Sequence, residues 1–450
     1  MKGTTFAYPM YLFSGYFTMG HHSDITKRFF LLAKHQEIQA LRHLSSNCKI
    51  VKAVTEMIHQ LQRERGMSNV FLCSRGERFA TQRAQQETAS EMSEKTLRSL
   101  LNALYLSNSD NGLTMRLVTT ITFALQGMDN LKDLRSKVAQ QQLTPTESTN
   151  AFCRLITALI DVIFEAADVA NDPAITRLLV ALFNFIQGKE YAGQERACGA
   201  IGFSSSHFQQ SLCDRITALT DSQNHSFETF SKFADDTELS MWQQQLESDH
   251  AQHLSRLRKM ICELGETGTC TAELSEIWYD IATLRIDAMQ DIEEHITDRL
   301  IEKATLRIAQ AEDELRNNEL LIASLNSSPP ISSPPTGDTP ISMIYDKTVK
   351  GLSMGGTHNE VGITSTSLSA HKSFYDLIRQ QAQHIQDIAN ELNGAKQALN
   401  EQKAIDRVKL LLMQQGQLSE SQAYKKLQSA AMEQNIRIAE LAQRMLESLS

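Results

Sequence analysis

Apolar residues recur at intervals of three and four along most of the chain between residues 24 and 325. One well-defined stripe consists of Val51, Val54, Ile58, Leu61 and, later, Leu72. This spacing marks one face of an α-helix and not the alternation of a β-strand. Because the segments between short polar breaks are several turns long, the pattern predicts an all-α, up-and-down helical bundle. We expect the helix around Trp278 to run on to about Ile322.

The composition changes at residue 326. Five of the eight prolines lie between residues 326 and 372, together with many Ser, Gly and Thr residues. Such a stretch cannot bury a core and is typical of a flexible linker. It separates a predicted domain at 24–325 from a predicted segment at 373–450. Residues 1–23 precede the first helical pattern, and we treat them as an N-terminal extension without an assigned function.

After the linker, the sequence predicts a helical stalk followed by a small three-helix unit at about 397–450. The stalk is polar with a thin apolar stripe, which fits either a homodimeric coiled coil or a single helix leaning on its neighbours. In the three-helix unit, Gly416 is expected to end the first helix. Ser419 is expected to cap the second helix, and Asn435 to cap the third.

The net charge of −9 argues against a surface coated with basic residues for non-specific nucleic-acid binding. Residues 397–450 differ, because 7 Lys and Arg there face 6 Asp and Glu. The seven cysteines are scattered without a CxxC pair, which favours reduced cytoplasmic thiols over disulfides or a structural zinc site. No run of about 20 apolar residues predicts a membrane span, and a signal peptide is poorly supported.

Several arginines interrupt the apolar stripes of the first domain, namely Arg65, Arg135, Arg196 and Arg285. Burying a guanidinium without a partner costs several kcal/mol. Each of these side chains therefore needs a carboxylate, carbonyl oxygens or a bound anion. A planar oxyanion fits the fork of guanidinium donors well. Ion pairs are the alternative, and Glu64, Glu190, Glu195 and Asp287 are available for them.

Three short motifs resemble the nitrate- and nitrite-sensing (NIT) domain family. They are the segments 62–68 (QRERGMS), 134–138 (LRSKV) and 188–197 (GKEYAGQERA). The resemblance covers roughly residues 45–300 and implies an all-helical domain that binds nitrate or nitrite through Arg65, Arg135 and Arg196. Arg63 and Arg285 join these ligand candidates by their pattern alone.

The tail resembles the ANTAR domain, an RNA-binding antitermination module. The resemblance begins at IDRVKLLLM (405–413) and continues through AYKKL (423–427) to IAELA (438–442). Leu410 departs from it, since the family usually has glycine there. RNA loops are recognised by stacking on aromatic rings and by basic side chains on phosphates. The RNA-binding candidates are Lys425, Lys426, Tyr424, Lys409 and Arg407.

Together these resemblances imply a nitrate- or nitrite-responsive regulator that binds leader RNA with hairpin loops and prevents transcription termination. The anion is an effector, and no cofactor is expected. A structural or anion-sensing protein-interaction module without RNA binding is the alternative. An enzyme is disfavoured because no phosphate loop, HExxH or GxSxG motif occurs, and His250 with His253 is a weak metal motif. DNA binding is disfavoured because no helix has groove-reading side chains.

Overall fold

The computed structural model describes the chain in six ranges, which are 20–107, 113–204, 210–267, 273–327, 366–416 and 420–449. These ranges contain helices and short connections and no strand, so the all-α prediction is confirmed for them. The predicted N-terminal extension and linker lie largely outside the described residues.

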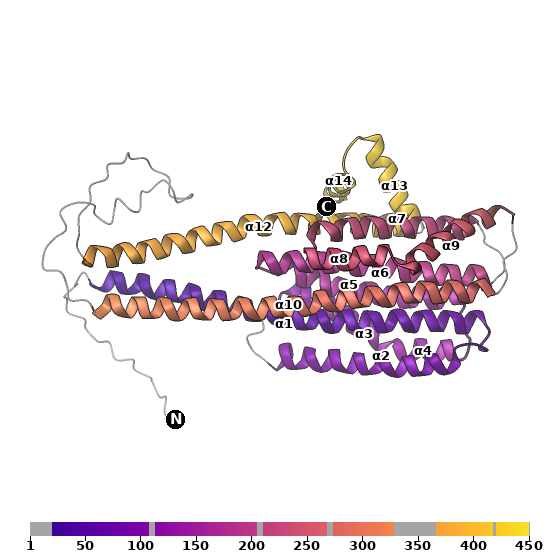
Figure 1. Cartoon of the computed structure of the whole chain (residues 1–450), viewed down its shortest axis with the longest axis horizontal. Coiled ribbons are helices and arrows are strands. Elements are labelled where there is room, and N and C mark those ends of the chain that lie inside the picture. Colours follow the sequence, from indigo (N-terminus) through magenta and orange to yellow (C-terminus); the bar gives the residue numbers. More distant parts are fainter. Residues whose placement is uncertain are drawn as a thin grey trace, which may run out of the picture. The chain divides into compact units, whose positions relative to one another are not determined.

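Figure 1 shows the helices coloured in the order in which they follow one another along the sequence. They are α1 (Gly20–Cys73), α2 (Ala80–Leu101) with the π-helical turn η1 (Asn102–Leu106), α3 (Met115–Asp129), α4 (Leu131–Ala139), α5 (Pro145–Asp168), α6 (Pro173–Ser204), α7 (Gln210–Phe233), α8 (Asp236–Leu246), α9 (Asp249–Thr267), α10 (Glu273–Ser327), α12 (Thr366–Gly416), α13 (Glu420–Glu433) and α14 (Ile438–Leu449). The long helix predicted around Trp278 is α10.

The chain divides into two compact units, and α1, α10 and α12 contribute residues to both. The smaller unit combines residues 1–39 with 309–384. Within it, the buried Lys34 donates to Glu37 at 3.0 Å and to Glu314 at 2.9 Å. These two ion pairs compensate the charge of the buried lysine.

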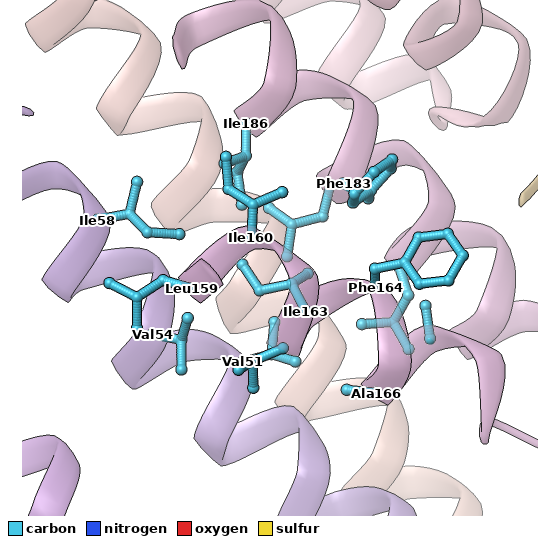
Figure 2. Packing of buried hydrophobic residues seen from close by; sticks show 14 of the residues in the cluster. Val51, Val54, Ile58, Leu159, Ile160, Ile163, Phe164, Ala166, Phe183 and Ile186 are labelled. Atoms are coloured by element: carbon cyan, nitrogen blue, oxygen red, sulfur yellow. The ribbon is translucent and has the colours of Figure 1, made fainter. Parts of the chain in front are cut away.

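The larger unit combines residues 40–308 with 385–450 and contains the main hydrophobic core. Figure 2 shows the stripe of α1 facing α5 and α6, and the labelled residues of α1 are Val51, Val54 and Ile58. All three side chains are at most 2% exposed. The apolar period of the sequence therefore correctly identified the buried face of α1.

Local sequence signals place two helix starts in this core. Thr144 forms a capping box with Glu147, and Pro145 occupies the first turn of α5. Asp172 accepts a hydrogen bond from the Ile175 amide at 3.1 Å and so caps α6. Both caps satisfy amide groups that have no partner within the helix.

Two predicted boundaries differ from the structure. Helix α12 begins at Thr366, inside the predicted linker, and runs without a break through the stalk into the first helix of the tail. Asn435 does not cap α14. It has a positive φ of 51°, and the Ile436 amide donates back to the Ala431 carbonyl at 3.1 Å, so Asn435 ends α13. The predicted cap Ser419 lies outside the described residues.

The stalk stripe behaves differently at its two ends. Ile385 is 55% exposed, whereas Leu399 is 1% exposed and belongs to the main core. Around Leu399, α12 thus leans on neighbouring helices of the same unit.

Within the described ranges, no helix combines the length and apolarity that a membrane span requires. Free thiols are found at Cys48, Cys73, Cys153, Cys198 and Cys213.

Candidate functional site

Arg65 lies where the apolar stripe of α1 meets α6. Its side chain is fully buried, and both terminal nitrogens donate to the Glu190 carboxylate, one of them at 3.1 Å. The same carboxylate accepts from Gln62 Nε2 at 2.9 Å. Burial disfavours the charged form, but the adjacent Glu190 carboxylate raises the pKa of Arg65 above its ordinary value. Arg65 is therefore a compensated cation.

Two glycines let the arginines of α1 and α6 cross closely. A Cβ atom at Gly193 would lie 2.4 Å from Arg65 Nη2, and one at Gly66 would lie 2.6 Å from Arg196 Nη2. Each arginine thus occupies the space that a side chain would take on the opposite helix. Only glycine permits this spacing without a shift of the guanidinium groups.

Arg196, on α6, is buried without a carboxylate. Its Nη2 donates to the Gln62 carbonyl at 2.9 Å, and its Nη1 donates to Thr283 Oγ1 at 2.9 Å. The guanidinium lies 5.1 Å from the centre of the Tyr279 ring. Its Nε has no acceptor, and no carboxylate lies within ion-pair distance among the described residues. Burial accordingly lowers the pKa of Arg196.

The structure does not place Arg135 with these two arginines. Arg135, on α4, donates to both oxygens of Glu64 at 2.8 and 2.9 Å, and it lies 3.5 Å from Glu91. This two-pronged ion pair compensates its charge. Its role as an anion ligand remains a prediction. Arg63 is half-buried, and its charge lowers the pKa of the nearby Arg196 and His59.

A buried ion pair joins α6 to α10. Lys189 Nζ donates to Glu293 Oε2 and to Gln290 Oε1, each at 2.6 Å, and neither charged side chain is exposed. The apolar pattern alone gives this pair no role. The sequence signal that could have identified the pair was the position of Lys189 on the same helical stripe as Arg196.

His59 of α1 faces this pair as a neutral imidazole. Burial lowers its pKa to about 2, and the charges of Lys189, Arg63 and Arg196 act in the same direction. Its Nδ1 is buried and has no hydrogen-bond partner. His59 therefore stays neutral in the folded protein at ordinary pH.

This burial predicts an acid-sensitive stability. The unfolded chain binds a proton at His59 below its ordinary pKa, whereas the folded chain does not, so stability falls as the pH drops below about 6.5. Between pH 7.5 and 5.0, the wild type should lose about 2 kcal/mol more than His59→Gln. Urea unfolding of both proteins at the two pH values measures this difference. Equal losses would show that His59 does not cause it.

The charges of the seam do not balance. We define the cationic seam as Arg65, Lys189, Arg196, Glu190 and Glu293, all of which are buried. The three cations face two carboxylates, and the unmatched charge resides on Arg196. Buried charges are stable when a counter-charge and hydrogen bonds accompany them. The seam therefore carries one positive charge more than its two carboxylates neutralise.

Most tail candidates are open to a ligand. Lys425, Lys426 and Arg407 are exposed, and Tyr424 is half-buried. Lys409 is only 7% exposed, and its role in RNA binding remains a prediction.

Helix α12 holds Lys409 against α6 within the same unit. Its Nζ donates to the Tyr191 hydroxyl at 3.3 Å. Six residues earlier, Lys403 Nζ lies 3.1 Å from Glu165 Oε1 and 4.6 Å from the centre of the Phe164 ring. Contacts between distant helices leave no local pattern, so the sequence did not point to Tyr191, Lys403 or Glu165.

The structure also bears on the metal alternative. Within the part of the chain that the structure describes, no three His, Cys, Asp or Glu side chains are grouped to hold a metal ion. His250 is half-buried and His253 is exposed on α9.

Comparisons with known proteins identify two domain families in the chain. The family model described as nitrate and nitrite sensing matches residues 56–301, more than half of the chain, and the ANTAR domain model matches residues 393–446. The nitrate regulatory protein of Klebsiella oxytoca is 27% identical over 418 residues, which cover 93% of this chain and 94% of that protein. The solved structure of the NasR transcription antiterminator has a similar fold. Its TM-score is 0.57 at 24% identity, over 94% of this chain and 99% of that one. The chain belongs to the nitrate- and nitrite-sensing (NIT) family and carries an ANTAR domain near its C-terminal end.

Proposed function

We propose that this protein is a nitrate- or nitrite-responsive positive regulator that binds leader RNA through its ANTAR domain and prevents transcription termination. The observation that carries the sensing half is Arg196, a buried guanidinium without a carboxylate. The two domain families supply the ligand class and the RNA-binding module. Leader RNA is made in the cytoplasm, which is where we place the protein.

Nitrate suits the cationic seam in charge and in shape. It is monovalent, which matches the single unmatched charge of the seam. It is also planar, like the guanidinium groups that would receive it. The Nε atoms of both Arg65 and Arg196 lack an acceptor and are available as donors. Tyr279 supports the Arg196 guanidinium from its ring face.

The exposed basic side chains of the tail suit RNA loops. Lys425 and Lys426 follow Tyr424 on α13, and Arg407 lies exposed on α12. Lysine and arginine neutralise phosphates, while an aromatic ring stacks on an unpaired base. We expect these four side chains to contribute to the RNA surface.

Helix α6 links the two functions. Glu190 and Arg196 belong to the cationic seam, and Tyr191 on the same helix contacts Lys409 of the tail. An anion that binds one arrangement of α6 better than another shifts the population toward that arrangement. We propose that the anion weakens the contacts of Lys409 and Lys403 with the sensor bundle and so frees the ANTAR domain for RNA.

A gel shift on a two-hairpin leader RNA tests this function. With the wild type, retardation should be stronger in nitrate than in chloride at equal ionic strength. Arg196→Gln should raise the nitrate concentration needed at least tenfold, since a hydrogen bond to a charged group contributes about 1.5–3 kcal/mol. Arg154→Gln, an exposed arginine of α5, is the matched control and should respond as the wild type does.

Each other outcome has a definite meaning. Equal retardation in nitrate and chloride would reject anion control of RNA binding. A normal nitrate response in Arg196→Gln would reject the cationic seam as the sensing site. An absence of retardation in every lane would reject the RNA-binding function and favour a protein-interaction module.

A further inference from the structure

A second charged cluster lies on the other side of α6. We call it the Arg258–Arg285 centre, and it consists of Glu195 (α6), Gln223 (α7), Arg258 (α9) and Arg285 (α10). Arg258 donates to both oxygens of Glu195, at 2.5 and 2.7 Å. Gln223 Oε1 accepts from Arg285 Nη1 at 2.8 Å and from Arg258 Nη2 at 3.2 Å, while its Nε2 donates to Glu195 at 2.8 Å.

This centre holds two guanidinium groups around one carboxylate. Arg258 takes both oxygens of Glu195 in a two-pronged pair, which leaves Arg285 with an amide oxygen as its polar partner. Burial and the neighbouring Arg258 lower the pKa of Arg285 to about 10, as expected for a cation without its own counter-charge. One positive charge is therefore unmatched here as well.

The Arg258–Arg285 centre is separate from the cationic seam. Glu195 and Arg196 are neighbours on α6, and adjacent helical residues point in different directions. Arg196 meets side chains and carbonyls of α1 and α10, whereas Glu195 meets α7 and α9. On α10, Thr283 accepts a hydrogen bond from Arg196 of the cationic seam, whereas Arg285 donates to Gln223 in the Arg258–Arg285 centre.

The two centres also differ in access to solvent. The Arg196 residue is 1% exposed, so an anion reaches it only when the helices move apart. The Arg258 side chain is 23% exposed, and Arg285 is partly exposed. The second centre is thus closer to solvent than the cationic seam. The affinity of an anion there should depend more strongly on ionic strength.

We propose that the Arg258–Arg285 centre is a second binding site for a small monovalent oxyanion, so that each chain binds two such ions. The ligand class rests on the proposed function, whereas the number of sites rests on the charges of this cluster. Arg285 supplies the unmatched charge, Arg258 adds a second guanidinium, and Glu195 keeps Arg258 in place. The second site fills from solvent while the cationic seam remains closed.

Isothermal titration calorimetry of the full chain with sodium nitrate tests the number of sites. Sodium gluconate keeps the ionic strength constant, and sodium nitrite is titrated in parallel. The wild type should bind two ions per chain, and Arg285→Gln and Arg196→Gln should each bind one. Arg256→Gln is the matched control, because Arg256 is an exposed arginine of α9, and it should bind two. Glutamine at 285 can keep the contact with Gln223, and circular dichroism verifies that each variant is folded.

Each alternative result would overturn the inference in a recognisable way. One ion in the wild type, lost in Arg196→Gln and kept in Arg285→Gln, would eliminate the second site and leave the proposed function intact. One ion lost only in Arg285→Gln would move the sensing site away from Arg196 and leave a single site. An absence of heat with either anion in every protein would reject anion sensing and the second site together.

Discussion

Lys189→Met is expected to lower the free energy of unfolding by about 3–5 kcal/mol, because it leaves the fully buried Glu293 without its counter-charge. Methionine matches the length of the lysine stem, so little packing is lost. The double variant Lys189→Met with Glu293→Leu removes both charges and should recover most of the loss, since an apolar pair of similar volume is often as stable as a buried ion pair.

Urea unfolding of the two single variants and the double variant measures this coupling in a double-mutant cycle. A double variant that is as unstable as the sum of the singles would show that the two side chains act independently. Lys52→Met serves as a control, because its pair with Asp298 is exposed and such pairs contribute about 0–1 kcal/mol.

Arg65→Met and Arg196→Met should change stability in opposite directions when no nitrate is present. Arg65→Met leaves the buried Glu190 without its counter-charge and should lower the free energy of unfolding by about 3–5 kcal/mol. Arg196→Met removes a buried charge that has no carboxylate and should raise the free energy of unfolding by about 1–4 kcal/mol, the range observed when apolar side chains replace buried ions. Chemical unfolding in nitrate-free gluconate buffer measures both changes.

The contrast between these variants is the informative result. A large loss in Arg196→Met would mean that this guanidinium already has a counter-charge in the free protein, and the argument for an anion at the cationic seam would fail. Addition of nitrate should stabilise the wild type through binding to the folded state. The same addition should stabilise Arg196→Met less.

The sequence predicted the helices well because their signal is local. A stripe such as Val51, Val54 and Ile58 has the helical period wherever it lies, and the structure buries all three residues. The Asn435 error has an equally local cause. Asparagine is favoured both before a helix and in the left-handed position after one, so the residue type alone does not distinguish the two ends.

The ion pairs could not be predicted in the same way, because each joins helices that are distant in sequence. Arg135 and Glu64 are separated by 71 positions, and Lys189 and Glu293 by 104. The helical period indicates that a charged side chain on an apolar stripe is buried. It does not indicate which residue of another helix pairs with that side chain. The burial of Lys409 could not be predicted for the same reason, since its contact is with Tyr191, 218 positions away.

The position of Tyr191 on α6 bears on how fast the protein can respond. Tyr191 and Arg196 are five residues apart, which corresponds to about 7.5 Å along the helix. Under the proposed coupling, a change at the arginine reaches the tail contact along this one helix. Because Arg196 is only 1% exposed, the helices must first move apart to admit an anion, and that opening precedes detachment of the tail. Stopped-flow traces should therefore show the opening of the bundle before the loss of the Lys409 and Lys403 contacts.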